Sequence, residues 1–151
     1  MSKYVARRPK PAASDTGGAL TIESWIPGRP AGDGPDGHSL WPAFTNVPNE
    51  FLEAYFPLRI VKYETIADSG GPGLHRGGNG LSMGYQFLEP GEISIHDDRW
   101  LTHPWGVNGG LPGQRSNKLM VRADGSSEWM KSKCDRIKVE PGDTLYFNTW
   151  G

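Results

Sequence analysis

Two histidines and an aspartate lie close enough in the sequence to form a metal site. His96, Asp98 and His103 fall within one short stretch, and imidazole with carboxylate is a ligand set that binds divalent metals. If the stretch turns back on itself, the imidazoles converge, and a stand-alone metal-dependent β-barrel enzyme is one candidate function. The simpler interpretation is a polar hairpin end, in which Asp97 and Asp98 accept turn hydrogen bonds.

A second set of reactive residue types lies around the glycine-dense stretch 69–80. Asp68, Ser69 and His75 are the residue types of a catalytic triad, although proximity in the sequence does not establish the geometry. Arg76 lies among six glycines, where its planar guanidinium suits either a carboxylate or the backbone carbonyls of the loop.

Glycine-rich runs also raise the question of nucleotide binding. The Walker pattern is absent from the sequence, and the dinucleotide fingerprint fails because Arg76 occupies the third glycine position after Gly71 and Gly73. We therefore expect this chain to bind no cofactor itself.

Size and composition predict a single cytoplasmic domain. The 151 residues fit one ordinary domain, and 16 Lys and Arg against 17 Asp and Glu leave no basic surface for nucleic acid. The single cysteine, Cys134, excludes an internal disulfide framework and fits a reducing compartment. There is no apolar run of the roughly 18 residues that a membrane span needs, and the first ten residues do not lead into the apolar segment of a secretory signal.

Residues 1–37 are expected to form an extended arm. Prolines and glycines recur throughout this segment and interrupt any regular helix or strand. Trp25 is the best candidate for an anchor on a neighbouring subunit. We therefore expect deletion of the arm to weaken assembly far more than it weakens folding of the remaining module, residues 38–151.

One short helix is predicted near residues 48–56. Asn46 is a candidate N-cap, and Leu52, Tyr55 and Phe56 recur at helical spacing on one side. We expect this helix to serve in packing.

Apolar residues alternate with small or polar ones along the rest of the chain, which is typical of half-buried strands. Strands are predicted at 58–66, 81–87, 93–95, 119–123, 137–139 and 144–149. The turn at 89–92 predicts a hairpin between 81–87 and 93–95, and Asp124-Gly125 predicts another. In the strand before that second turn, Leu119 and Val121 mark the expected apolar face. Five to seven short strands with Gly and Pro turns predict an all-β fold, a β-sandwich or partial barrel.

Two glycine-dense stretches, 69–80 and 104–113, do not fit strands. Ordered glycine at this density is found where chains pass very close together or need a positive φ. Polyproline-type packing of the segments would explain the density, and so would a ligand-binding loop.

Several short strings follow one another in order along residues 44–151. They are Asn46-Val47-Pro48-Asn49-Glu50, Pro57-Leu58-Arg59-Ile60, Asp68 to Gly73, Arg76 to Gly80, Pro104-Trp105-Gly106, Gly109 to Gly113 and Gly142-Asp143. In this order they resemble the C-terminal region of the hydantoinase B and acetone carboxylase alpha-type family, which includes subunits of 5-oxoprolinase and acetophenone carboxylase.

The resemblance implies a β fold with glycine-rich, polyproline-II-like segments, and a place in a heteromeric complex. It is strongest to a small subunit of acetophenone carboxylase, which implies ATP-dependent, biotin-independent carboxylation of a ketone, acetophenone to benzoylacetate. ATP and a divalent metal would then be held by larger ATP-binding and hydantoinase B-like partner subunits. This chain would have a structural or assembly role, with Trp25, Asp68, Arg76 and Trp105 as structural or interface candidates.

The same resemblance leaves an alternative, a subunit of a hydantoinase or 5-oxoprolinase-type cyclic-amide hydrolase. It also implies a large N-terminal portion, which carries metal in the related acetone carboxylase, and a glycine-rich tail. Neither has a counterpart in this sequence, so no metal ligands are carried over from that portion.

Overall fold

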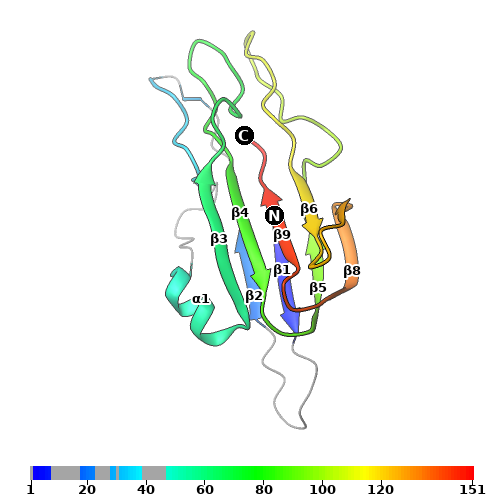
Figure 1. Cartoon of the computed structure of the whole chain (residues 1–151). Coiled ribbons are helices and arrows are strands. Elements are labelled where there is room, and N and C mark those ends of the chain that lie inside the picture. Colours follow the sequence, from blue (N-terminus) through cyan, green and yellow to red (C-terminus); the bar gives the residue numbers. More distant parts are fainter. Residues whose placement is uncertain (1, 8–17, 23–27, 30, 39–46) are drawn as a thin grey trace.

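The computed structural model describes residues 2–7, 18–22, 28–29, 31–38 and 47–151. These residues contain one helix and nine strands (Figure 1). The elements are β1 Ser2–Arg7, β2 Gly18–Ile22, α1 Asn49–Tyr55, β3 Leu58–Thr65, β4 Leu81–Phe87, β5 Gly91–His96, β6 Asn117–Val121, β7 Ser127–Trp129, β8 Lys133–Val139 and β9 Thr144–Asn148.

The strands form two antiparallel sheets. One has the order β2-β1-β5-β8, and the other has the order β3-β4-β9-β6-β7. In Figure 1 the smaller sheet lies behind the larger one, with its strands running along nearly the same axis. Among the described strands neither sheet closes on itself, so the predicted all-β fold is confirmed as an open, partial β-sandwich.

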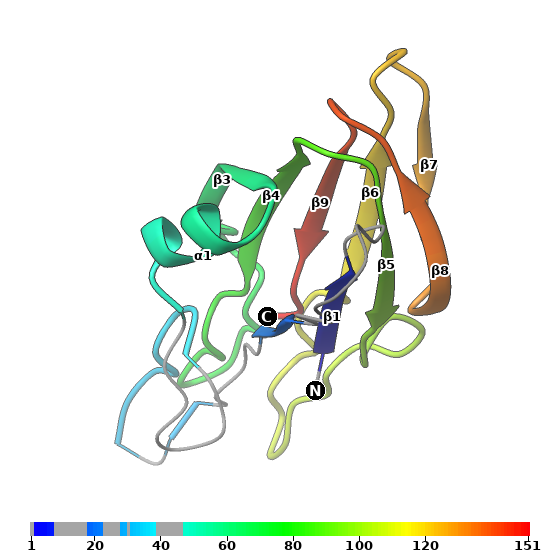
Figure 2. The same ribbon diagram turned by 90° about the horizontal axis from the view of Figure 1, so that it is seen from below.

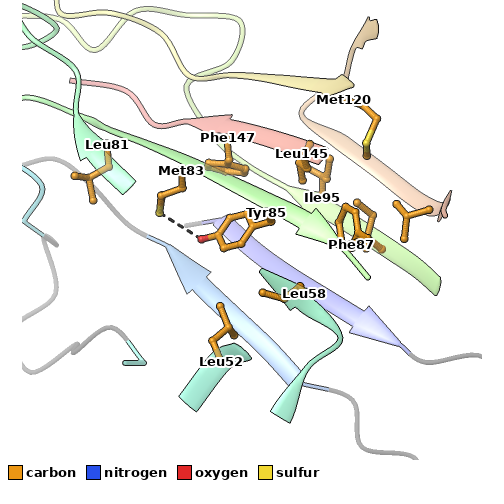
Figure 3. Close-up of a cluster of buried hydrophobic side chains, with 12 residues drawn as sticks. Leu52, Leu58, Leu81, Met83, Tyr85, Phe87, Ile95, Met120, Leu145 and Phe147 are labelled. Atoms are coloured by element: carbon orange, nitrogen blue, oxygen red, sulfur yellow. Dashed lines mark hydrogen bonds between the residues drawn. The ribbon is translucent and has the colours of Figure 1, made fainter. Parts of the chain in front are cut away.

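Side chains from both sheets fill the space between them (Figure 3). Met83 and Tyr85 of β4 pack with Phe147 of β9 and with Ile95 of β5, all nearly inaccessible to solvent. The Tyr85 hydroxyl donates a hydrogen bond to Met83 Sδ at 3.3 Å, and burial raises the pKa of that phenol. Burying each large apolar side chain contributes about 1.5–3 kcal/mol to folding, so this layer holds the sheets together.

Consecutive strands β4 and β5 belong to different sheets. The predicted hairpin between 81–87 and 93–95 is therefore wrong, because the turn between them carries the chain from one sheet to the other. The connection from β8 to β9 also crosses between the sheets. It is hydrogen-bonded to the connection after β4: the Phe87 amide donates to the Asp143 carbonyl, and the Gly142 amide donates to the Phe87 carbonyl, both at 2.8 Å. Alternating apolar residues indicate one buried face of a strand but not its neighbours in the sheet.

The connection from β8 to β9 is held by the buried carboxylate of Asp143. Its oxygens accept hydrogen bonds from Arg122 Nη1 and the Ala123 amide, both at 2.9 Å, and from the Glu140 amide at 3.1 Å. Burial acts to raise the pKa of Asp143, but the hydrogen bonds from Arg122 and the two amides bring it below its ordinary value. The Gly142-Asp143 string thus has a structural role at the crossing.

The hairpin predicted at Asp124-Gly125 is confirmed by the pairing of β6 with β7. The buried face of β6 differs from the prediction, however. Lys118 and Met120 are fully buried, whereas Leu119 and Val121 are only half-buried.

The described parts of residues 1–37 are more regular than the sequence suggested. β1 pairs with β2 on one side and with β5 on the other, from Lys3 opposite His96 to Arg7 opposite Glu92. The prediction that this segment contains no regular strand is therefore wrong, and an extended arm over residues 1–37 stays a prediction. Because β1 completes the smaller sheet, deleting it would disturb the β core as well as any docking. Trp25 lies outside the described residues.

The predicted short helix is confirmed as α1, which packs beside β3 (Figure 2). It begins after Pro48 without a side-chain cap, and the candidate cap Asn46 lies outside the described residues. Leu52 is buried as predicted, whereas Tyr55 is 67% exposed and stacks on Phe51 at a centroid distance of 4.2 Å. No helix of the described residues is long and apolar enough to cross a membrane.

Candidate functional site at the glycine-rich end of the sandwich

The two glycine-dense stretches meet at one end of the sandwich, beside residues 31–38 and 149–151 (Figure 1). Backbone hydrogen bonds join them: the Leu111 amide donates to the Pro72 carbonyl at 2.8 Å, and the Gly34 amide donates to the Arg76 carbonyl at 2.8 Å. We call residues 31–38, 66–80, 98–116 and 149–151 the glycine-rich end.

Glycine is required here because backbones touch. A Cβ at Gly70 would overlap the Gly77 carbonyl, and one at Gly113 would overlap the carbonyl of Gly151. These contacts confirm that glycine is dense here because segments of the backbone pass very close to one another. The polyproline II conformation of the segments stays a prediction.

Arg76 joins segments 31–38 and 66–80 by hydrogen bonds. Its Nη1 donates to Asp36 Oδ1 at 2.7 Å and to the Gly77 carbonyl at 2.9 Å, and its Nη2 donates to Asp36 Oδ2 at 3.3 Å. The guanidinium thus does both things considered for it, binding a carboxylate and a loop carbonyl. The hydrogen bond from Arg76, followed by that from the Asn79 amide, holds the pKa of Asp36 below its ordinary value.

Asp68, Ser69 and His75, the residue types of a catalytic triad, do not form a triad, and Ser69 has a structural role. Ser69 is fully buried, where its Oγ donates to the Ile66 carbonyl and accepts from the Gly80 amide, both at 2.8 Å. Asp68 is exposed and adopts a left-handed backbone conformation, with φ of 56°, and His75 Nδ1 lies 3.8 Å from Asp33. Ser69 therefore has no accessible hydroxyl for nucleophilic chemistry.

The three metal-ligand candidates have separate partners. His96 Nε2 lies 2.9 Å from Asp135 Oδ1, and this hydrogen bond lowers the pKa of Asp135. The Nδ1 of His103 lies 2.7 Å from the Gly113 carbonyl, and Asp98 Oδ1 lies 4.0 Å from Lys133 Nζ. Across the described part of the chain, no group of three or more His, Cys, Asp or Glu side chains could hold a metal, so these three candidates do not form a metal site together.

A buried polar cluster that the sequence did not reveal supports the base of loop 98–116. Lys118 and Asp97, both inaccessible, form an ion pair, and Ser116 Oγ contacts Asp97 Oδ2 and donates to the Asp98 carbonyl at 2.9 Å. Lys118 Nζ also lies 4.7 Å from the centre of the Phe147 ring. Burial lowers the pKa of Lys118, while the contacting carboxylate acts in the opposite direction. No sequence signal marks Lys118, because charged residues are rarely buried in a strand.

A cavity of about 270 Å³ opens among the glycine-rich segments. It is lined by Gly28, Gly71, Pro72, His75, Gly77, Arg99, Pro104, Trp105, Gly106, Val107, Gly110, Leu111, Gly113 and Gly151. The Arg99 guanidinium lies 4.3 Å from the centre of the Trp105 ring. Trp105, predicted as a structural or interface residue, therefore lies in the wall of this cavity, whereas Arg99 was not singled out from the sequence.

Large apolar side chains are exposed around the same end. Leu74 is 95% exposed and Val107 is 73% exposed, and Leu101 and Leu111 are also largely accessible. Apolar groups gathered on the surface in this way mark sites of interaction.

The family follows from a sequence comparison. The model described as hydantoinase B/oxoprolinase matches residues 6–151, so this chain belongs to the hydantoinase B/oxoprolinase family. The resemblance found in the short strings is thereby confirmed at the level of the family.

Individual relatives agree with this assignment. The chain is 36% identical over 106 residues to an uncharacterized protein of Methanocaldococcus jannaschii, covering 70% of this chain and 18% of that protein. It is 32% identical over 102 residues to 5-oxoprolinase 1 of Arabidopsis thaliana, covering 68% and 8%. It is 31% identical over 127 residues to a putative D-/L-hydantoinase subunit of a Pseudomonas species, covering 82% and 21%.

Solved structures share the fold. An ATP-dependent caprolactamase from Pseudomonas jessenii superposes with a TM-score of 0.77 at 18% identity, over 99% of this chain and 28% of that one. Nucleotide-free acetone carboxylase gives a TM-score of 0.72 at 12% identity, over 100% and 25%. The chain thus shares its fold with one part of each of these two enzymes. It spans less than a third of the length of each of these relatives and structures.

Proposed function

We propose that this chain is a small subunit of a heteromeric carboxylase that uses ATP, does not use biotin and acts on a ketone. The reaction is the carboxylation of acetophenone to benzoylacetate. This chain's own role is structural. ATP and a divalent metal would be bound by larger partner subunits, one of them hydantoinase B-like.

The exposed apolar side chains at the glycine-rich end carry the proposal of an assembly role. Leu74 and Val107 project from loops whose backbones are fixed by hydrogen bonds and glycine contacts. A rigid, apolar surface of this kind suits a permanent interface, because little conformational freedom is lost on binding.

The choice of a ketone is supported by the resemblance of the ordered sequence strings to acetophenone carboxylase. A second candidate, ATP-dependent hydrolysis of a cyclic amide, is supported by the names of two relatives, a 5-oxoprolinase and a putative D-/L-hydantoinase. Both candidates leave the role of this chain unchanged.

The experiment is affinity purification of the tagged chain with its native partners, followed by assays of the purified complex. ATP- and bicarbonate-dependent loss of acetophenone would support the carboxylase. ATP-dependent opening of 5-oxoproline or hydantoin, without use of bicarbonate, would establish the second candidate instead.

Point variants test the assembly role. Leu74→Asp and Val107→Asp should reduce recovery of partner subunits while leaving the chain folded. Leu88→Asp is the matched control, because Leu88 is also exposed but follows β4 at the opposite end of the sandwich. Equal recovery of partners with all three variants would contradict the proposed role.

A further inference from the structure

The cavity at the glycine-rich end has an unusual combination of charge and apolar surface. Among its described lining residues, Arg99 is the one permanently charged side chain, His75 is the other titratable one, and no acidic side chain contributes. Trp105, Val107 and Leu111 provide apolar surface. A cationic group in an apolar recess favours an anion with an apolar body.

Arg99 differs from the other arginines that hold this structure together. Arg76 and Arg122 each form an ion pair with an aspartate, whereas within the described parts of the chain Arg99 has no carboxylate at ion-pair distance. Its guanidinium lies over one face of the Trp105 ring. Stacking of this kind leaves the N–H groups at the rim of the guanidinium available to donate to a ligand.

The backbone of Arg99 is held by the buried polar cluster of Asp97, Ser116 and Lys118. Its backbone has φ of 56°, a conformation that costs a non-glycine residue free energy and persists only where the surroundings enforce it. Here the Ser116 amide donates to the Arg99 carbonyl at 3.1 Å, and Ser116 is itself held by the buried Asp97 and Lys118. These contacts hold the backbone of Arg99, and stacking on Trp105 restricts its guanidinium, so little conformational freedom is lost when it binds an anion.

We propose that this cavity binds a small monocarboxylate with a flat, apolar body, such as an aryl carboxylate. Arg99 donates to the carboxylate oxygens, and Trp105 with Leu111 contacts the body. The volume of about 270 Å³ is close to the roughly 300 Å³ at which small-molecule sites begin. The inference does not depend on whether the assembly acts on a ketone or a cyclic amide.

The test uses the full chain, with calorimetric titration of benzoate, its neutral counterpart benzamide, and inorganic phosphate. Saturable 1:1 binding of benzoate is expected, with benzamide and phosphate each weaker by about tenfold or more, since a charge-assisted hydrogen bond and the apolar contact are each lost in one of them.

Substitutions locate the site. Arg99→Asn should weaken benzoate about tenfold or more, and it should still fold, because asparagine tolerates a positive φ. Arg99→Lys should keep part of the affinity, and Trp105→Leu should weaken benzoate and benzamide alike.

Controls are Arg59→Gln, on an exposed position of β3, and Trp129→Leu, whose side chain is 68% exposed against 66% for Trp105. Both should leave binding unchanged. Equal binding of benzoate and benzamide, no saturable binding at millimolar benzoate, or unchanged affinity in Arg99→Asn would each overturn the proposal. If the natural chain binds no benzoate and the Arg99→Asn variant loses its partner subunits, the cavity instead binds a carboxylate of a partner protein.

Discussion

Lys118 of β6 and Asp97, which follows β5, form an ion pair that is closed off from solvent between the two sheets. The pair joins one sheet to the other at the end of the molecule that carries the glycine-rich segments. Among the described residues Asp97 Oδ1 has no hydrogen-bond partner, so Lys118 and Ser116 are left to stabilise this carboxylate.

Removing one member of the pair should be costly. Lys118→Met leaves Asp97 charged and buried, and we expect it to lower the free energy of unfolding by about 3–5 kcal/mol. The double variant Asp97→Leu with Lys118→Met should cost less than the single one, because Ser116 Oγ keeps its hydrogen bond to the Asp98 carbonyl. Urea unfolding of both variants measures the difference, and a double variant less stable than Lys118→Met would contradict the explanation.

Glycine contacts at the glycine-rich end should be sensitive to a single methyl group. Gly70→Ala places a Cβ against the Gly77 carbonyl, and we expect a loss of about 1–3 kcal/mol from overpacking. Gly32→Ala is the control, since a Cβ there meets nothing within 4 Å, and it should change stability by no more than about 0.5 kcal/mol. Thermal unfolding of the two variants under identical conditions provides the comparison.

The ion pair of Asp36 with Arg76 should make stability depend on acidity. The folded-state pKa of Asp36 is lowered, first by the Arg76 hydrogen bond, so its contribution is complete above the unfolded value of about 3.9. As the pH falls below that value, the unfolded chain binds the proton first, and the contribution is lost as the pH passes through the lowered pKa.

Asp36→Asn should therefore cost about 0.5–1 kcal/mol at neutral pH. The difference in unfolding free energy between this variant and the natural chain should shrink as the pH is lowered from about 4, near the unfolded value. Unfolding curves at several pH values test this, and a difference that stays constant would rule out Asp36 as the titrating group.

Deleting residues 1–22 should destabilise the whole sandwich. β1 lies between β2 and β5, so the deletion removes two strands and leaves the backbone groups of β5 unpaired on that side. We expect a lower unfolding temperature and faster amide exchange at Ile93 and Ile95. Unchanged stability together with lost assembly would instead restore the idea of a purely docking arm.

The strand positions could be predicted from the sequence, because alternation of apolar residues directly reflects a strand with one buried face. β3, β4, β6 and β9 appear close to where this pattern placed them. Which strands are neighbours could not be predicted, since the turn after Phe87 looks the same whether the chain folds back or crosses to another layer.

The site was accessible to sequence reasoning only in part. Arg76 and Trp105 stood out because bulky side chains among glycines are conspicuous. The partner of Arg76 is Asp36, forty positions upstream, and that of Lys118 is Asp97, which follows a strand of the other sheet. Such pairings follow from the three-dimensional fold, and local residue patterns do not encode them.

The position of β9 has a consequence for how the chain folds. It lies between β4 and β6, although it follows every other described strand in the sequence. Until β9 is inserted, the larger sheet exists only as two separate strand pairs, β3 with β4 and β6 with β7, each with an open edge. Contacts between residues so far apart in the chain form slowly, so the step that limits folding should be the closing of β9 between them, and exposed strand edges make aggregation the main competing process.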